Sequence, residues 1–220
     1  MASDDLAKLV AGAVAPISPL LFQDVSDALT NAEQRVGDLV RSGAVHLRAL
    51  TMREELRAML ADQDLQGWAV GGNPGKMGEL YLKHPETGIL LRVLKERRKT
   101  YPGGIPVAGA NRARRAYWSR ANAPQWIQGA LTGHGMPPAE PLGLLLVWDL
   151  VSARDLEQGF TLRVVRTAEP GDFGSRVRLD LSVELDATAS AWTHLQFLGD
   201  DEMEDFFPDE ETGTGQQGAM

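Results

Sequence analysis

The residues with the clearest chemical potential are nine cations between Arg92 and Arg120, where Glu96 is the only acid. This segment carries a net charge of +8, whereas the whole chain carries −8, so the remaining residues carry −16. A basic segment in an acidic chain is the pattern expected of a surface that contacts phosphate groups or an acidic protein. The sequence therefore predicts an anion-binding region here.

Aromatic side chains are interleaved with these cations and offer surfaces on which nucleic-acid bases stack. The predicted anion or nucleic-acid site consists of Lys95, Arg97, Arg98, Lys99, Tyr101, Arg112, Arg114, Arg115 and Trp118. Two other interpretations stay open, because arginines on a solvated loop can pair with the chain's own acidic tail or contact a protein partner.

The centre of the basic segment, residues 100–110, is rich in glycine and proline and precedes a helix for which Asn111 is the predicted cap. Glycines let backbone N–H groups approach an anion, and a helix start adds positive potential. The segment lacks the Gly-Lys-Ser/Thr ending of a phosphate-binding P-loop and the glycine spacing of a dinucleotide fingerprint. It therefore indicates no nucleotide cofactor.

Catalytic arrangements are few in this chain. The sequence has no cysteine, and none of its four histidines is spaced as a metal-ligand pair, which excludes thiol catalysis and the common zinc motifs. A metal-dependent nuclease needs carboxylates close to a lysine, and Glu79, Lys83, Lys95 and Asp149 are the candidates. Because charged residues on a half-exposed hairpin are ordinary, the sequence favours a protein that is not an enzyme, without metal or cofactor, and it identifies no catalytic residue with certainty.

The C-terminal residues are strongly acidic. Eight acids lie between Asp200 and Glu211, around the apolar residues Met203, Phe206 and Phe207. This composition is typical of disordered segments that fold onto basic partners, and it can equally anchor the last ordered turn. We expect a disordered acidic tail over 200–220 whose partner-binding residues are Met203, Phe206 and Phe207.

Two amphipathic helices are expected before the basic segment. The first begins where Ser18 can cap a helix and Pro19 fits its first turn, and its apolar stripe runs to about Arg41. The stripe can cover a sheet or form a homodimer seam through helix 19–41. The second begins at Thr51, which forms a capping-box pattern with Glu54, and ends at about Asp62.

Beyond residue 67 the apolar pattern changes to alternation, which indicates strands. The predicted strands are 79–83, 89–95, 142–150, 160–166, 176–185 and 192–198. The first two flank a five-residue connection and form a predicted hairpin, and the nearly continuous apolar run 142–150 indicates a central strand buried on both faces.

These elements predict an α+β fold in which N-terminal helices pack on a mainly antiparallel sheet of six or seven strands. The expected organisation is a flexible N-terminus over 1–17, a single domain over 18–199 (helical 18–64, sheet-rich 67–199) and the tail 200–220. Two uncharged runs, 9–22, which prolines 16 and 19 interrupt, and 141–148, are both shorter than the roughly 20 residues that span a membrane. The sequence therefore predicts no membrane span and a cytoplasmic location. The arginine excess, 17 arginines to 5 lysines, favours a bacterial or phage source.

The sequence as a whole favours a non-enzymatic regulatory or interaction protein whose segment 92–120 contacts nucleic acid or an acidic protein surface, with a protein partner expected. The alternatives are a metal-dependent nucleic-acid-processing enzyme, resembling a nuclease in its chemistry, and an antitoxin or inhibitor-type protein that uses its acidic tail.

Overall fold

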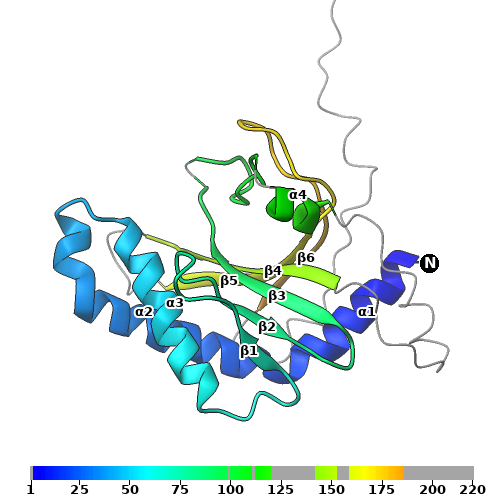
Figure 1. The fold of residues 1–220 in the computed structure, drawn as a ribbon, viewed down its shortest axis with the longest axis horizontal. Helices are drawn as coiled ribbons and strands as arrows, with labels where there is room; N and C mark the ends of the chain where they lie inside the picture. Colours follow the sequence, from blue (N-terminus) through cyan, green and yellow to red (C-terminus); the bar gives the residue numbers. More distant parts are fainter. Residues whose placement is uncertain (1, 99, 111, 120–141, 153–158, 186–220) are drawn as a thin grey trace, which may run out of the picture.

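A computed structural model describes residues 2–98, 100–110, 112–119, 142–152 and 159–185 of this chain. The helical elements are α1 (Ala2–Val14), the 3-10 turn η1 (Ala15–Ile17), α2 (Ser18–Arg41), α3 (His46–Ala61) and α4 (Arg112–Trp118). The strands are β1 (Ala69–Gly71), β2 (Tyr81–Lys83), β3 (Ile89–Lys95), β4 (Leu142–Leu150), β5 (Phe160–Thr167) and β6 (Leu179–Leu185). The α+β class is confirmed (Figure 1).

The six strands form one mixed sheet in the order β1-β2-β3-β4-β5-β6. Four neighbouring pairs are antiparallel, whereas β3 and β4 are parallel. The prediction of a mainly antiparallel sheet therefore holds except for this pair, whose strands are not joined by a short link. The chain has 46 residues between Lys95 and Leu142, which is ample for the crossover that a parallel pair requires. The parallel pair brings the C-terminal ends of β3 and β4 to the same edge of the sheet.

The strand predictions are confirmed in most places. The hairpin of β2 and β3 and the interior position of β4 are as expected, and β1 is an additional strand. The strand predicted over 176–185 begins only at Leu179, because Asp172–Ser175 form a turn and residues 176–178 follow it as irregular chain. The strand predicted over 192–198 lies outside the described residues, as does the acidic tail.

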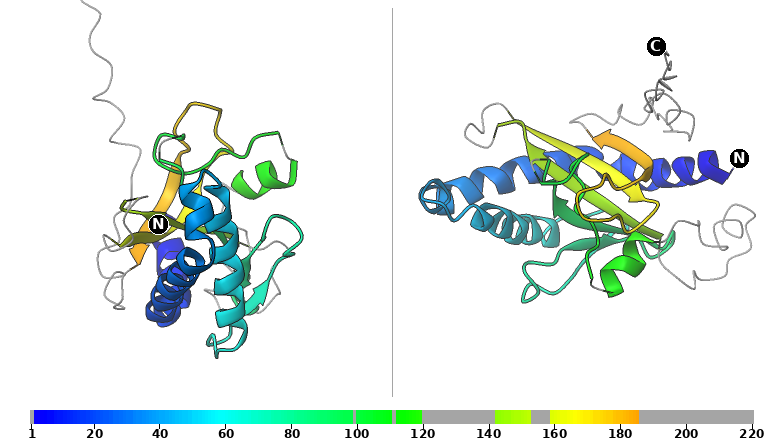
Figure 2. Two further views of the ribbon diagram at one scale, coloured as in Figure 1. Left: turned by 90° about the vertical axis from the view of Figure 1, so that its left-hand side faces the viewer. Right: turned by 90° about the horizontal axis from the view of Figure 1, so that it is seen from above.

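The N-terminus is helical, so the prediction of a flexible segment over 1–17 is wrong. Leu6, Val10, Val14 and Ile17 recur at steps of four and three, and all four side chains are buried. Pro16 and Pro19 do not end the helix, because each occupies a first-turn position, in η1 and in α2, where a backbone N–H has no helical partner. Seen from above, α1 and α2 run in line along the molecule (Figure 2).

The caps predicted for the two helices before the basic segment, Ser18 and Thr51, are wrong. Ser18 continues the helix, and its hydroxyl donates to the carbonyl of Val14 at 3.0 Å instead of accepting from a following N–H. Thr51 lies inside α3, which begins at His46 after a tight turn through Gly43, whose φ is +116°. That turn satisfies the end of α2 through a bond from the Ala44 N–H to the Leu39 carbonyl, so α3 can begin earlier than its capping pattern indicates.

The sheet is covered on both faces (Figure 1). One apolar cluster joins α1, α2 and α3 to one face, and a second cluster lies on the other face beneath α4 and the loops around Ile105 and Val177. β4 supplies Leu144 and Leu146 to the first cluster and Leu145 to the second, which confirms that it is buried on both faces. The apolar stripe of α2 packs within this core, whereas a homodimer through helix 19–41 stays a prediction.

Within this core α2 buries a carboxylate. Asp24 is 5% exposed; its Oδ1 accepts from Gln63 Nε2 at 3.1 Å, whereas its Oδ2 has no partner among the described residues. Burial raises the pKa of Asp24 above its ordinary value of 3.8, an effect that the Gln63 hydrogen bond partly offsets. The ionised carboxylate therefore destabilises the fold at neutral pH.

Asp24→Asn should raise the free energy of unfolding at pH 7 by roughly 1 kcal/mol, because an amide keeps the acceptor oxygen without the buried charge. Since the folded-state pKa is raised, the stability of the original protein is fully present below the unfolded pKa and falls as pH rises through the folded pKa. The gain of the variant should therefore vanish toward pH 3.8. Urea unfolding at several pH values measures it, with Glu86→Gln, at an exposed position distant in sequence from Asp24, as the control; equal gains in both variants would contradict the prediction.

The helix formed by Leu6–Arg41 is 36 residues long, and its most apolar window has a mean hydropathy of 1.5, so by length and composition it is a candidate membrane span. Of that window 44% is buried inside the protein, and a core helix or a signal sequence meets the same criterion. The helix is therefore weak evidence for a membrane location, and among the described residues it is the only such candidate.

Candidate anion-binding site

A cavity of about 1110 Å³ opens at the edge of the sheet where β3 and β4 both end. Its walls come from β3 and the residues after it, from the end of β4, from the first half of α3, from the turn 76–79 and from α4. Clefts at the carboxyl ends of parallel strands are common ligand sites, because the chain leaves the sheet there in different directions.

The cavity is strongly basic. Its described lining includes three acids, Glu79, Glu96 and Asp149, and seven cations, which are Arg53, Lys76, Arg92, Lys95, Arg97, Arg98 and Arg114. The excess of positive charge stands in a chain whose net charge is −8. An anionic ligand would find complementary charge here and would be attracted from a distance.

Part of this positive charge is already neutralised. Arg92 pairs with Glu79 at 3.2 Å, and Arg98 pairs with Glu96 at 2.8 Å. Within the described part of the chain, Lys76 and Arg97 make no ion pair, and both side chains are exposed. These two cations are therefore available to an incoming anion without breaking an existing pair.

Two half-buried cations of the cavity, Lys95 and Arg114, have lowered pKa values. Burial lowers the pKa of Lys95, which lies over the Trp148 ring at 5.3 Å from the ring centroid, and Asp149 partly restores it. Burial also lowers the pKa of Arg114, and the neighbouring charges of Arg92 and Arg97 lower it further. An anion in the cavity would stabilise the charged form of each group.

Asp149 faces these cations from the end of β4. Burial raises the pKa of Asp149, while the charge of Lys95 and a hydrogen bond from the Leu150 N–H, 3.0 Å from Oδ1, lower it. Its Oδ2 lies 3.9 Å from the Nε of Arg98. Asp149 therefore balances only a small part of the positive charge around it.

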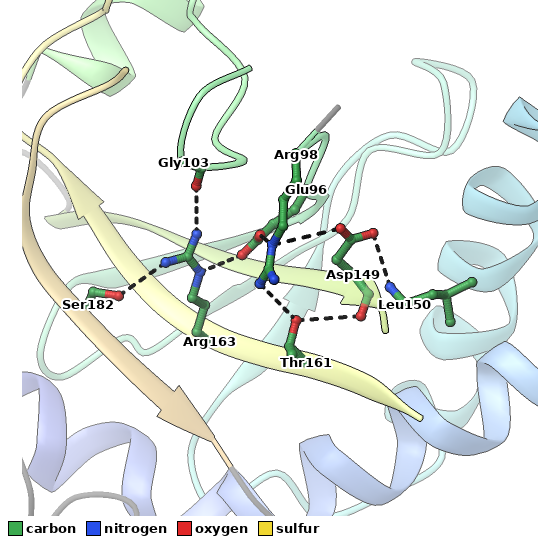
Figure 3. Close-up of polar contacts among 8 residues, drawn as sticks. All are labelled: Glu96, Arg98, Gly103, Asp149, Leu150, Thr161, Arg163 and Ser182. Carbon is green, nitrogen blue, oxygen red and sulfur yellow. Dashed lines mark hydrogen bonds and ion pairs between the residues drawn. The ribbon is translucent and has the colours of Figure 1, made fainter. Parts of the chain in front are cut away.

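A buried carboxylate organises the wall formed by the chain after β3 (Figure 3). The Glu96 side chain is fully buried and accepts one bond from Arg98 Nε at 2.8 Å and another from Arg163 Nε on β5. Arg163 also donates to the Gly103 carbonyl at 2.9 Å, and Arg98 donates to the Thr161 hydroxyl at 3.3 Å. Glu96 thus ties the loop that follows β3 to β5, which lies two strands away in the sheet.

The loop itself is closed by backbone bonds. Arg97 N–H donates to the Gly104 carbonyl at 2.8 Å, and Tyr101 N–H donates to the Arg97 carbonyl at 2.8 Å. Gly104 has a φ of +84°, and a Cβ at this position would lie 2.6 Å from Glu96 Oε2, so only glycine fits. The loop therefore holds the backbone of Tyr101 in place, and the residue lines the cavity.

The structure brings together five of the nine site residues predicted from the sequence, namely Lys95, Arg97, Arg98, Tyr101 and Arg114. Arg112 and Arg115 lie on α4 with exposed side chains but do not line the cavity. Lys99 and the tail residues Met203, Phe206 and Phe207 lie outside the described residues, as does the predicted cap Asn111.

The prediction that Trp118 offers a stacking surface is wrong. Its side chain is fully buried in the second apolar cluster, and its indole N–H donates to the Pro106 carbonyl at 3.0 Å. The guanidinium of Arg114 lies over its ring, 5.3 Å from the centroid. Trp118 therefore anchors α4 and supports Arg114 from beneath.

Sequence reasoning missed Arg53, Lys76 and Arg163, because they lie far from the basic segment along the chain. Arg53 donates to the carbonyls of Met77 at 2.7 Å and Gly78 at 2.9 Å, which fixes the turn that carries Lys76. The alternation of apolar and polar residues along β5 could have placed Arg163 on one face of the strand. It could not have shown that Arg163 pairs with Glu96.

The carboxylates proposed for a metal site are only partly brought together. Glu79, Lys95 and Asp149 line the cavity, whereas Lys83 lies at the far end of β2, opposite Leu90 of β3. Across the described ranges, no group of three or more His, Asp or Glu side chains could hold a metal ion. The nuclease alternative therefore has two of its proposed acids, Glu79 and Asp149, at the cavity, while the third acid of the described lining, Glu96, is paired with two arginines.

No family model, curated protein or solved structure matches this chain, so the interpretation of the cavity depends on its own chemistry.

Proposed function

We propose that this protein is a non-enzymatic regulatory or interaction protein that binds nucleic acid by taking phosphate groups into the basic cavity. The observation that carries the proposal is the convergence of seven Lys and Arg side chains, from β3, α3, α4 and two loops, around one opening. Phosphate contacts of this kind supply most of the sequence-independent affinity for nucleic acid.

The arrangement of the cations supports a phosphate ligand. Arg98 is held in place by Glu96, and Arg92 by Glu79, so their guanidinium groups are ordered before a ligand arrives. Preordered arginines lose less entropy when they form charge-assisted bonds to phosphate. Lys76 and Arg97 supply exposed charge at the opening, which suits electrostatic attraction of a polyanion.

The test is a double variant, Lys76→Glu with Arg97→Glu, which reverses the charge of both exposed cations. A fluorescent 20-nucleotide probe, measured by anisotropy as a single strand and as a duplex, should bind the original protein at low salt and dissociate as salt rises. The variant should bind both forms about 10- to 100-fold more weakly at low salt, and its salt dependence should be shallower by roughly two phosphate contacts.

The matched control is Lys8→Glu with Lys83→Glu, which makes the same change in net charge at exposed positions outside the cavity. If both double variants lose affinity equally, the effect is one of net charge and the cavity is not the site. If the original protein binds neither form of the probe at low salt, the proposed function is wrong, and an acidic protein surface becomes the better candidate.

The metal-dependent nuclease keeps one observation in its favour, because Glu79 and Asp149 line the same cavity as the cations. Incubating the same probe with Mg²⁺ separates the two functions. We expect the probe to stay intact, whereas cleavage that Asp149→Ala abolishes would establish the enzyme instead.

A further inference from the structure

An exposed aromatic side chain stands beside the basic cavity. The Phe173 side chain is 83% exposed, and its ring centroid lies 6.2 Å from that of Tyr101 in an edge-to-face arrangement. Tyr101 lines the cavity, close to Arg97 and Arg114. We call Tyr101 and Phe173 the aromatic rim.

Phe173 is not needed by the core, since it belongs to neither apolar cluster. A single exposed apolar side chain is ordinary on a protein surface. The case for Phe173 depends on its position, because its ring meets the ring of Tyr101 at the wall of the basic cavity. Phe173 is therefore an exposed ring beside the cavity, available to a ligand and outside the apolar core.

Both loops that carry the aromatic rim are held in place. Arg163 donates to Gly103 at 2.9 Å on the Tyr101 side, and the turn before Ser175 is closed by bonds of 3.1 Å and 2.8 Å to the Asp172 carbonyl. The loops are joined by a bond from the Ala108 N–H to the Pro170 carbonyl at 2.9 Å. The backbone that carries the aromatic rim is thus held next to the basic cavity.

We propose that the nucleic acid bound by this protein is single-stranded, with its phosphates in the cavity and its bases stacked on the aromatic rim. This inference rests on the proposed function and names its substrate class. A duplex hides the faces of its bases inside the stack, whereas an unpaired strand offers every base as a flat surface. Basic grooves lined with aromatic residues bind single strands with little sequence preference, and stacking serves both DNA and RNA.

The experiment compares three probes in the same anisotropy format: a 20-nucleotide oligo(dT), a 20-base-pair duplex and inorganic polyphosphate, which has charge but no bases. Phe173→Ala should weaken oligo(dT) binding about 10-fold and leave polyphosphate binding unchanged, because only stacking is lost. Phe173→Trp should restore the affinity. Leu39→Ala, at an exposed apolar position outside the cavity, is the control and should change nothing.

Phe173→Ala should weaken the binding of an oligo(U) probe of the same length as much as it weakens oligo(dT) binding. A loss of affinity for only one of the two probes would show that the protein distinguishes RNA from DNA, and it would overturn the inference that base stacking alone is responsible. Unchanged oligo(dT) affinity, or an equal loss for oligo(dT) and the duplex, would also overturn it. If polyphosphate still binds and the Lys76→Glu, Arg97→Glu variant abolishes that binding, the basic cavity remains an anion site. If the original protein binds none of the probes, both proposals are wrong.

Discussion

Glu96→Ala should lower the free energy of unfolding by about 3 to 5 kcal/mol, because it removes the carboxylate shared by two arginines. The Glu96 side chain is fully buried, and its partner Arg163 has a side chain that is only 16% exposed. Without Glu96 the Arg163 charge stays largely buried, and Glu184, opposite it on β6, makes no ion pair with it among the described residues. Breaking a buried ion pair from one side costs far more than the net value of the pair.

Chemical denaturation measures this effect, and the matched control is Glu79→Ala. Glu79 also pairs with a cavity arginine, but both side chains remain partly exposed, at 22% and 26%, so about 1 kcal/mol is expected. Trypsin should cut the Glu96→Ala variant faster after Arg97 and Arg98, because the loop loses its attachment to β5. A loss below about 1 kcal/mol for Glu96→Ala would contradict the role assigned to this carboxylate.

The second large effect is expected from Trp118→Ala, at about 3 to 5 kcal/mol of stability. The indole is fully buried against the face of the sheet that carries Leu145 and Val147, and its removal leaves a large cavity there. The Pro106 carbonyl would also lose its hydrogen bond. The loss should appear in denaturation before any binding partner is added.

Trp118→Phe separates packing from hydrogen bonding, since it keeps most of the ring and removes the N–H; a loss of about 1 to 2 kcal/mol is expected. An exposed stacking residue would behave in the opposite way, with unchanged stability and weaker nucleic-acid binding after Trp118→Ala. That result would restore the original interpretation of Trp118 as a base-stacking surface.

Much of the fold could be predicted because its patterns are local and strong. The apolar steps of α2, the turn between β2 and β3 and the continuous apolar run of β4 each admit few alternatives. The helix starts could not be predicted in this way. Ser18 and Thr51 have the chemistry of caps, but hydroxyl groups also bond within a helix, and burial of Leu6 and Val10 extends the first helix past the expected cap.

The site was only partly predictable for a related reason. Charge density along the chain identified Lys95, Arg97, Arg98 and Arg114, because they are close in sequence. Burial decides which of the other predicted residues reach the site, and the sequence does not show burial. A tryptophan among arginines gives the same local sequence whether its ring faces solvent or is buried beneath a helix. The cations contributed by α3 and by the turn at Lys76 require the tertiary arrangement, which no spacing reveals.

The parallel pairing of β3 and β4 has a consequence for the order of folding. Ile89 of β3 lies opposite Leu142 of β4, so this contact closes a long stretch of chain, whereas the α2–α3 pair and the β2–β3 hairpin close short ones. Contacts between distant residues form late, because the entropy of the loop must be lost first. The anion cavity, which needs the ends of both strands, is therefore completed near the end of folding, and a bound ligand should act mainly by slowing unfolding.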